Sequence, residues 1–81
     1  MNKMSHRLQL PAVRSDYDRA LAEAEFYREL ADRAREVREQ LGLTRAETAR
    51  RSRMSRSTIC RIENGLQMNT RQFLALRGAF G

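Results

Sequence analysis

Residues 44–65 read TRAETARRSRMSRSTICRIENG, and this stretch decides the fold. It carries six arginines against two glutamates, a net charge of +4, whereas residues 15–42 carry eight acids against five arginines, a net of −3. The remaining charge lies in residues 1–14, with +3, and in residues 66–81, with +2. A basic segment beside an acidic one both attracts and orients a polyanion. The charge pattern therefore predicts that one face of the molecule binds a polyanion.

The same stretch contains the signals of two short helices joined by a tight turn. Thr44 with Glu47 has the spacing of a capping box, which predicts a helix that runs to about Ser52. Ser55 is a favoured cap for a second helix. The Asn64-Gly65 pair ends that helix, because glycine adopts the left-handed conformation at little cost.

The 81 residues allow a single domain that is only marginally stable alone, and dimerisation would stabilise it. No apolar run approaches the roughly 20 residues that span a bilayer, and the first residues lack the apolar stretch of a signal peptide. We therefore expect a cytoplasmic protein. One cysteine, Cys60, and one histidine, His6, argue against a disulfide and a metal site, and we expect no cofactor. The scarcity of β-branched and aromatic residues at alternating positions predicts an all-α fold.

Upstream of this stretch the chain divides into an arm and a helix. Residues 1–14 mix basic and apolar side chains without helical period and are predicted to form a basic, flexible arm. Ser15 with Asp18 fits a further capping box, so a helix starts there and ends at Gly42. No glycine or proline interrupts it, which favours one continuous helix, although a bend near Tyr27 remains open.

Helical spacing also predicts core positions. In the long helix one stripe comprises Leu30, Ala34, Val37 and Leu41, and an earlier one comprises Tyr17, Leu21, Ala24 and Tyr27. The earlier stripe is either core or, as we favour slightly, a surface for a second copy. A last helix is expected after a cap at Asn69 or Thr70, with Phe73, Leu74, Leu76 and Phe80 at helical spacing.

The second short helix has two distinct sides. At 100° per residue Ile59 and Ile62 lie within about 60° of each other and define a buried side. The opposite sector holds Ser57, Cys60, Arg61 and Asn64, with Arg56 at its edge. Arginine pairs with guanine through two hydrogen bonds, and serine or threonine bonds to several base edges in the major groove. The segment has no aromatic residue, which argues against single-stranded RNA, whose readers rely on aromatic platforms.

The sequence resembles the helix-turn-helix repressors of the phage Cro and C1 type, also called the xenobiotic-response-element family. The resemblance rests on Gly42-Leu43-Thr44, Glu47, Ala49, Ser55, Thr58-Ile59 and Ile62-Glu63-Asn64-Gly65, and it covers roughly residues 30–81. It implies a compact helical bundle of the repressor type, with residues 30–81 as the DNA-binding domain and residues 15–29 as a helical extension for a dimer or another partner.

The resemblance also implies two groups of DNA contacts. Base edges would face Arg56, Ser57, Thr58 and Arg61, of which Thr58 has the weakest support because it lies near the core edge. Phosphates would be held by Arg45, Arg53, Ser55, Asn64 and Arg71. Glu63 and Asn64 also have purely structural interpretations, Glu63 as the partner of a nearby arginine and Asn64 as the end of a helix. Cys60 is interpreted as a bystander thiol rather than a redox sensor, because nothing marks a resolving partner.

Two residues depart from the family pattern. Thr48 stands where leucine is usual, which predicts weaker packing between the two short helices. Arg53 stands where the turn usually has glycine. If that turn keeps a positive φ, Arg53 costs about 1 kcal/mol or slightly more; a different turn geometry is the alternative.

Three classes of function follow for comparison. The first is a sequence-specific regulator, a dimeric repressor that reads an inverted repeat in double-stranded DNA. The second is an antitoxin whose acidic extension, with its acids between Glu23 and Glu39, neutralises a basic toxin while the two short helices control the shared promoter. An enzyme is disfavoured, since the chain has neither a glycine-rich phosphate loop nor a nucleophile paired with a base.

Overall fold

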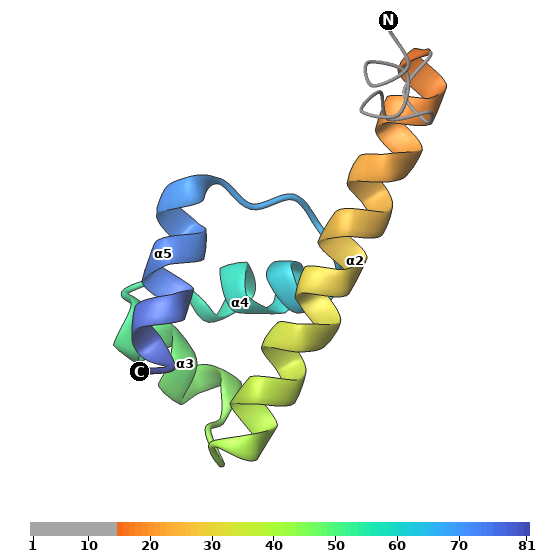
Figure 1. Cartoon of the computed structure of the whole chain (residues 1–81). Helices are drawn as coiled ribbons and strands as arrows, with labels where there is room; N and C mark the ends of the chain where they lie inside the picture. The colour runs from red at the N-terminus through yellow and green to blue at the C-terminus, as the bar shows by residue number, and fades with distance from the viewer. Residues whose placement is uncertain (1–14) are drawn as a thin grey trace, which may run out of the picture.

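The computed structural model describes residues 15–81, so the predicted arm at residues 1–14 lies outside the described part. Four helices follow one another: α2 at Asp16–Gln40, α3 at Arg45–Ser52, α4 at Arg56–Glu63 and α5 at Thr70–Ala79 (Figure 1). Within residues 15–81 the structure contains no strand. The prediction of an all-α fold is confirmed.

Helix α2 is continuous, so the bend near Tyr27 that the sequence left open does not occur. Ser15 caps it, and the Ser15 hydroxyl accepts a hydrogen bond from the Asp18 amide at 3.2 Å. The helix ends before Gly42, which takes a φ of +71° as expected. Only Ala31, Ala34 and Arg38 of α2 are buried, and all three lie in its second half.

The three shorter helices begin where their caps predict. Thr44 and Glu47 form both hydrogen bonds of a capping box at the start of α3, and Asn69 with Gln72 does the same for α5. Ser55 caps α4 by accepting from the Thr58 amide at 3.0 Å. Gly65, with a φ of +85°, makes the left-handed turn after α4. These hydrogen bonds satisfy amides that have no partner within the first turn of a helix.

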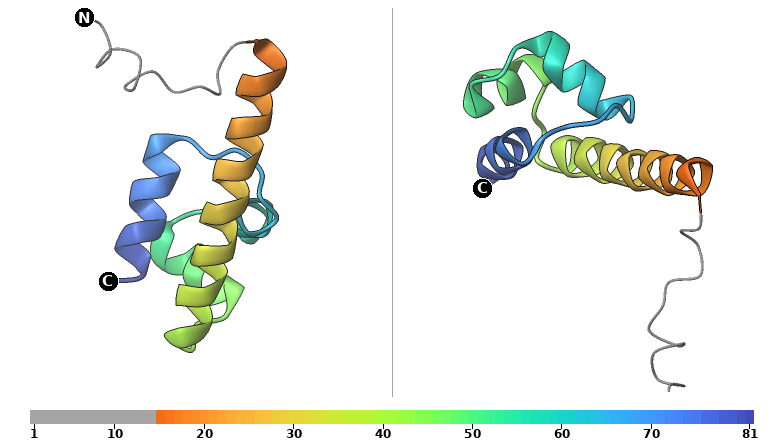
Figure 2. Two further views of the ribbon diagram at one scale, coloured as in Figure 1. Left: turned by 45° about the vertical axis from the view of Figure 1, so that its right-hand side comes forward. Right: turned by 90° about the horizontal axis from the view of Figure 1, so that it is seen from above.

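The helices form two layers. Seen from above, α3 and α4 lie in one layer and α2 and α5 in the other, with α4 packed on α2 and α3 packed on α5 (Figure 2). The core between the layers is made of the buried residues Ala34, Ala49, Ile59, Ile62, Met68 and Leu76. Ile59 and Ile62 are completely or nearly completely buried, as their spacing predicts.

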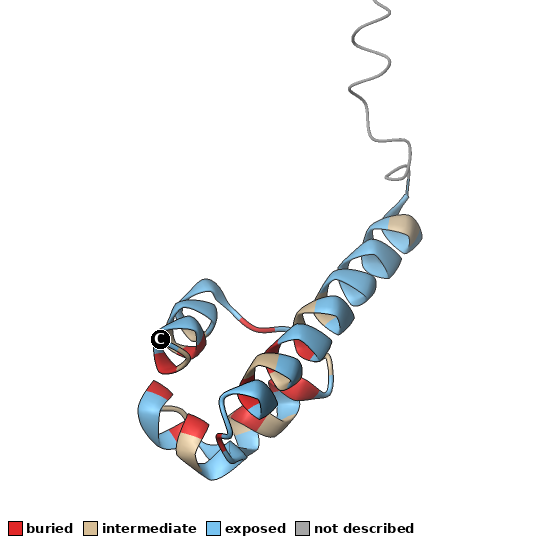
Figure 3. Cartoon of the chain, turned by 60° about the horizontal axis from the view of Figure 1, so that its bottom comes forward, coloured by how far each residue is buried: buried red, intermediate tan, exposed pale blue. Residues whose placement is uncertain are grey.

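The first half of α2 projects beyond the rest of the molecule, past the carboxyl end of α4 (Figures 1 and 2). Its side chains are almost all exposed, and the buried residues gather where the helices meet (Figure 3). Tyr17, Leu21 and Phe26 are exposed to 75%, 47% and 54%. An isolated helix of about three turns is marginal in water, so this half depends on continuity with the packed half.

Several core predictions need correction. Leu41 is 49% exposed because the helix has already ended at Gln40, and Arg38 takes the buried position instead. Phe73 and Leu74 are exposed, so Leu76 is the main core contribution of α5. Tyr27 belongs to the core rather than to a free surface: it packs against the core cluster, and its hydroxyl donates to the Met68 carbonyl oxygen at 3.4 Å.

The turn between α3 and α4 places Arg53 at a φ of +59° and ψ of +35°. The left-handed geometry is therefore kept without glycine. Thr48, the other departure from the family pattern, is fully buried, and its hydroxyl donates to the Thr44 carbonyl oxygen at 3.0 Å. No helix among the described residues has the length and apolar character that crossing a bilayer requires.

Candidate nucleic-acid interface

Helix α4 is held from one side and free on the other. Ile59 and Ile62 anchor it in the core, whereas Arg56, Ser57 and Arg61 are exposed. Thr58 and Cys60 are half-buried, so their positions are intermediate between the two sides. The predicted division of this helix is confirmed for its buried isoleucines and for its exposed Ser57, Arg61 and Asn64, whereas Cys60, which was predicted on the outward side, is half-buried.

At the start of α4 two of the predicted contact residues bind each other. The hydroxyl oxygens of Ser55 and Thr58 lie 2.9 Å apart, and Ser55 also accepts from the Thr58 amide. Ser55 is exposed and Thr58 is half-buried. This arrangement fixes the orientation of the first turn of α4.

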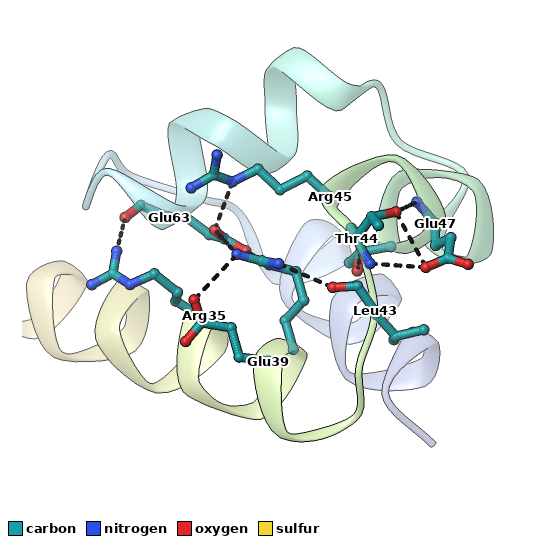
Figure 4. A network of polar contacts seen from close by, with 9 residues as sticks. Arg35, Glu39, Leu43, Thr44, Arg45, Glu47 and Glu63 are labelled. Carbon is teal, nitrogen blue, oxygen red and sulfur yellow. Dashed lines mark hydrogen bonds and ion pairs between the residues drawn. The ribbon is translucent and has the colours of Figure 1, made fainter.

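The carboxyl end of α4 is held by a buried carboxylate. Glu63 accepts two hydrogen bonds from Arg38 of α2, with Nε to Oε2 at 2.6 Å and Nη2 to Oε1 at 3.1 Å. Arg38 also donates to the Leu43 carbonyl oxygen at 3.0 Å, and Arg35 donates to the Glu63 backbone oxygen at 3.2 Å (Figure 4). Glu63 therefore joins α4 to α2, and the interpretation of Glu63 as the partner of an arginine is confirmed.

The same carboxylate also holds Arg45, the first residue of α3. The Arg45 Nε donates to Glu63 Oε1 at 3.0 Å, while the arginine side chain remains 45% exposed (Figure 4). Among residues 15–81 the two terminal nitrogens of Arg45 donate no hydrogen bond. One edge of the guanidinium is thus fixed, and its other edge is free for an anion.

Burial alone raises the pKa of the Glu63 carboxyl, since a buried charge loses its hydration. The hydrogen bonds and charges of Arg38 and Arg45 outweigh this effect, and the pKa lies below its ordinary value. The pKa of Arg38 is raised, chiefly by its hydrogen bond to Glu63, although burial opposes the rise. Both side chains are therefore ionised wherever the protein is folded near neutral pH.

The other predicted phosphate contacts are distributed around α4. Arg53 lies exposed in the turn before α4, and Asn64 lies exposed at its carboxyl end with a φ of −95°. Arg71 is exposed in the first turn of α5. All predicted site residues except half-buried Thr58 are therefore exposed, and the Glu63 contact brings Arg45 to the carboxyl end of α4.

Sequence reasoning missed the roles of Arg35 and Arg38. A signal for Arg38 was available, because it follows Ala31 and Ala34 at spacings of seven and four, which places it on the buried side of α2. An arginine on a buried side requires a carboxylate partner, and Glu63 is the buried one here. The hydrogen bond from Arg35 to a backbone oxygen had no comparable signal.

Chemically, the arrangement can donate hydrogen bonds and positive charge to an extended polyanion. Within residues 15–81 no cluster of side chains suits a metal ion. A family model described as helix-turn-helix domain matches residues 29–76, which is more than half of the chain. No curated protein and no solved structure gives a significant match.

Proposed function

This chain belongs to the helix-turn-helix domain family, and we propose that it is a transcriptional regulator that binds double-stranded DNA at specific sequences. The observation that carries the proposal is the geometry of α4, which is anchored by Ile59 and Ile62 and presents Arg56, Ser57 and Arg61 outward. A rigid helix with one free polar side fits the major groove of DNA.

In the proposed mechanism one set of side chains reads base edges and another binds phosphates. Arg56, Ser57, Arg61 and, with less exposure, Thr58 read base edges. Arg45, Arg53, Ser55, Asn64 and Arg71 hold phosphates and set the position of α4 in the groove. The contact with Glu63 supports phosphate binding by Arg45, because a guanidinium that is already oriented loses less side-chain freedom when it binds a phosphate.

We further propose that the protein works as a dimeric repressor on an inverted repeat in the cytoplasm. Two copies related by a twofold axis would place their α4 helices in successive major grooves, about 34 Å apart. Support for a second copy comes from the projecting half of α2, whose exposed apolar side chains do not contribute to the core of this chain.

Selection from random duplexes tests the proposal. The selected pool should contain two related half-sites in opposite orientation, centred about one helical turn apart. A gel-shift series with the selected duplex, a scrambled duplex and RNA of matched sequence then measures preference. Equal binding to all three would exclude sequence-specific recognition of double-stranded DNA.

An antitoxin is the alternative function, and the acidic projecting half of α2 favours it. Residues 16–25 carry four acids and one arginine, which gives a net charge of −3 on a helix that is free to contact a basic protein. Coexpression with a small basic protein encoded beside this gene would decide between the functions. A stable complex that relieves the toxicity of that neighbour would support the antitoxin, whereas a harmless neighbour that does not bind would exclude it.

A further inference from the structure

Two exposed apolar surfaces that include residues of α2 are candidates for contact with a second copy. One is a strip of Tyr17, Leu21 and Ala24 on the projecting half, all of them exposed. The other is an apolar groove between α2 and α5. The groove is lined by Phe26, Leu30, Val37, Met68, Phe73 and Phe80.

We propose that the second copy binds the strip of Tyr17, Leu21 and Ala24, with the two α2 helices antiparallel and crossing near Leu21. This inference rests on the proposed dimer and names its surface. Tyr17, Leu21 and Ala24 recur at spacings of four and three, so they lie on one side of the helix. Ala24 and the neighbouring Ala20 are small and allow close approach of the second helix.

The charges on α2 bear on the orientation of the pair. The acids Asp16 and Asp18 occupy its first turn, and Arg28 follows the strip at its other end. In an antiparallel pair centred near Leu21, Arg28 of one copy lies about two residues beyond Asp16 of the other, whereas Glu25 lies opposite Tyr17, close to Asp16 and Asp18. A parallel pair would place the acidic turns together, and like charges that close repel.

The orientation of α4 on α2 is compatible with one duplex. At 100° per residue the strip lies about 75° from the buried side formed by Ala31, Ala34 and Arg38. The twofold axis of an antiparallel pair is perpendicular to both helices and to the line that joins them. Helix α4, which packs on the buried side, therefore lies on the same side of the pair in both copies.

The expected distance between the α4 helices of the two copies distinguishes pairing through the strip from pairing through the groove. The segment from α4 to Gly65 contacts α2 between Arg28, beside Gly65, and Arg38, beside Glu63. The midpoint of this region is near residue 33. At 1.5 Å per residue, pairing about Leu21 separates the two midpoints along the helix by about 36 Å, close to one turn of DNA. Pairing through Phe26 and Leu30 in the groove would separate them by only about 15 Å.

The strip is short, since Asp16 to Arg28 spans about 18 Å of helix. It buries less than the roughly 800 Å² per partner of a typical stable complex. We therefore expect a weak dimer in solution that becomes tight on a duplex, because two half-sites hold both copies at high effective concentration.

Cysteine crosslinking tests the surface in a Cys60→Ser background. Leu21→Cys and Phe26→Cys are a matched pair, because the two side chains are similarly exposed, at 47% and 54%, and lie about 140° apart around α2. With a short bismaleimide and the selected duplex, Leu21→Cys should give a covalent dimer with at least about tenfold higher yield than Phe26→Cys. Equal yields, or a higher yield from Phe26→Cys, would overturn the proposal.

A second variant separates the surface from DNA recognition. Leu21→Glu should retain the helical circular dichroism signal and the binding of a single half-site, but lose cooperative binding to two half-sites. Unchanged cooperativity would show that the copies meet elsewhere. If selection yields no preferred duplex, the proposed function fails, and crosslinking of the free protein at high concentration still tests the strip: a dimer through Leu21→Cys supports it, and none contradicts it.

Discussion

At the scale of single residues, Arg53 shows the cost of a left-handed turn without glycine. Its φ of +59° is a conformation in which the Cβ atom crowds the backbone. Arg53→Gly should raise the free energy of unfolding by up to about 1 kcal/mol, because relief of this strain exceeds the added freedom of glycine in the unfolded chain. Urea unfolding monitored by circular dichroism measures the change.

Gly42 provides the reverse control for this prediction. It has a φ of +71°, and nothing lies within 4 Å of the position where a Cβ atom would stand. Gly42→Ala should therefore destabilise by about 1 kcal/mol through backbone strain alone. A destabilising Arg53→Gly would instead show that the arginine side chain contributes more than its strained backbone costs.

The second residue prediction concerns Glu63. Glu63→Gln leaves Arg38 buried without its counter-charge, and breaking such a pair costs about 3 kcal/mol or more. Urea unfolding of the variant measures the loss. Glu39→Gln is the matched control, since the Glu39 carboxylate is exposed and lies 3.9 Å from Arg38, and we expect little effect. Similar losses in the two variants would contradict a special role for the buried carboxylate.

The ion pair of Arg38 and Glu63 predicts that the stability of the protein depends on pH. The folded protein holds the pKa of Glu63 below its ordinary value, so the unfolded chain takes up a proton first as the pH falls. The stabilisation is complete above the ordinary pKa of about 4.5 and is lost as the pH falls through the lower pKa of the folded state. Unfolding free energy measured from about pH 6 to about pH 2 should fall more steeply for the wild type than for Glu63→Gln.

At the scale of elements, α4 and the residues around it should divide recognition into two kinds of contact. Arg56→Ala and Arg61→Ala should each cost about 1 to 3 kcal/mol at particular base pairs and relax the preference there. Arg45→Ala should weaken binding to all sequences about equally. Because Arg45 also binds Glu63, the unfolding free energy of the Arg45→Ala variant must be measured in parallel. Equal losses across every sequence for all three variants would contradict the division.

At the scale of the whole molecule, the uneven charge predicts a steep dependence of DNA affinity on salt. If Arg45, Arg53 and Arg71 each neutralise a phosphate in both copies of a dimer, six counterions are displaced, and the logarithm of affinity should fall with a slope of about −5 against the logarithm of salt. Between 50 and 200 mM salt the affinity should then fall about a thousandfold. Fluorescence anisotropy with a labelled duplex measures the affinity at each salt concentration, and a slope near zero would exclude phosphate binding.

Much of the fold was predictable because its signals are local. Caps at Thr44, Ser55 and Asn69 and the left-handed glycines at 42 and 65 depend on hydrogen bonds and backbone geometry within a few residues, so the sequence locates the helices closely. The burial of Ile59 and Ile62 also followed from spacing alone. The exposure of Leu41 did not, since α2 ends at Gln40 and Arg38 takes the buried position instead.

The sequence by itself determined the helices, the buried and outward sides of α4, and a basic segment beside an acidic one, because each depends on local capping, periodicity or charge. Tertiary structure alone decided that Glu63 joins Arg38 and Arg45 across three helices, that Arg53 keeps a positive φ, and that half of α2 projects past α4. The ion pairs of Glu63 depend on contacts between residues 18 and 25 positions apart, and the projection of α2 depends on how far packing extends along that helix. Local pattern can mark Arg38 as buried, but it cannot specify which carboxylate pairs with it or where packing on α2 stops.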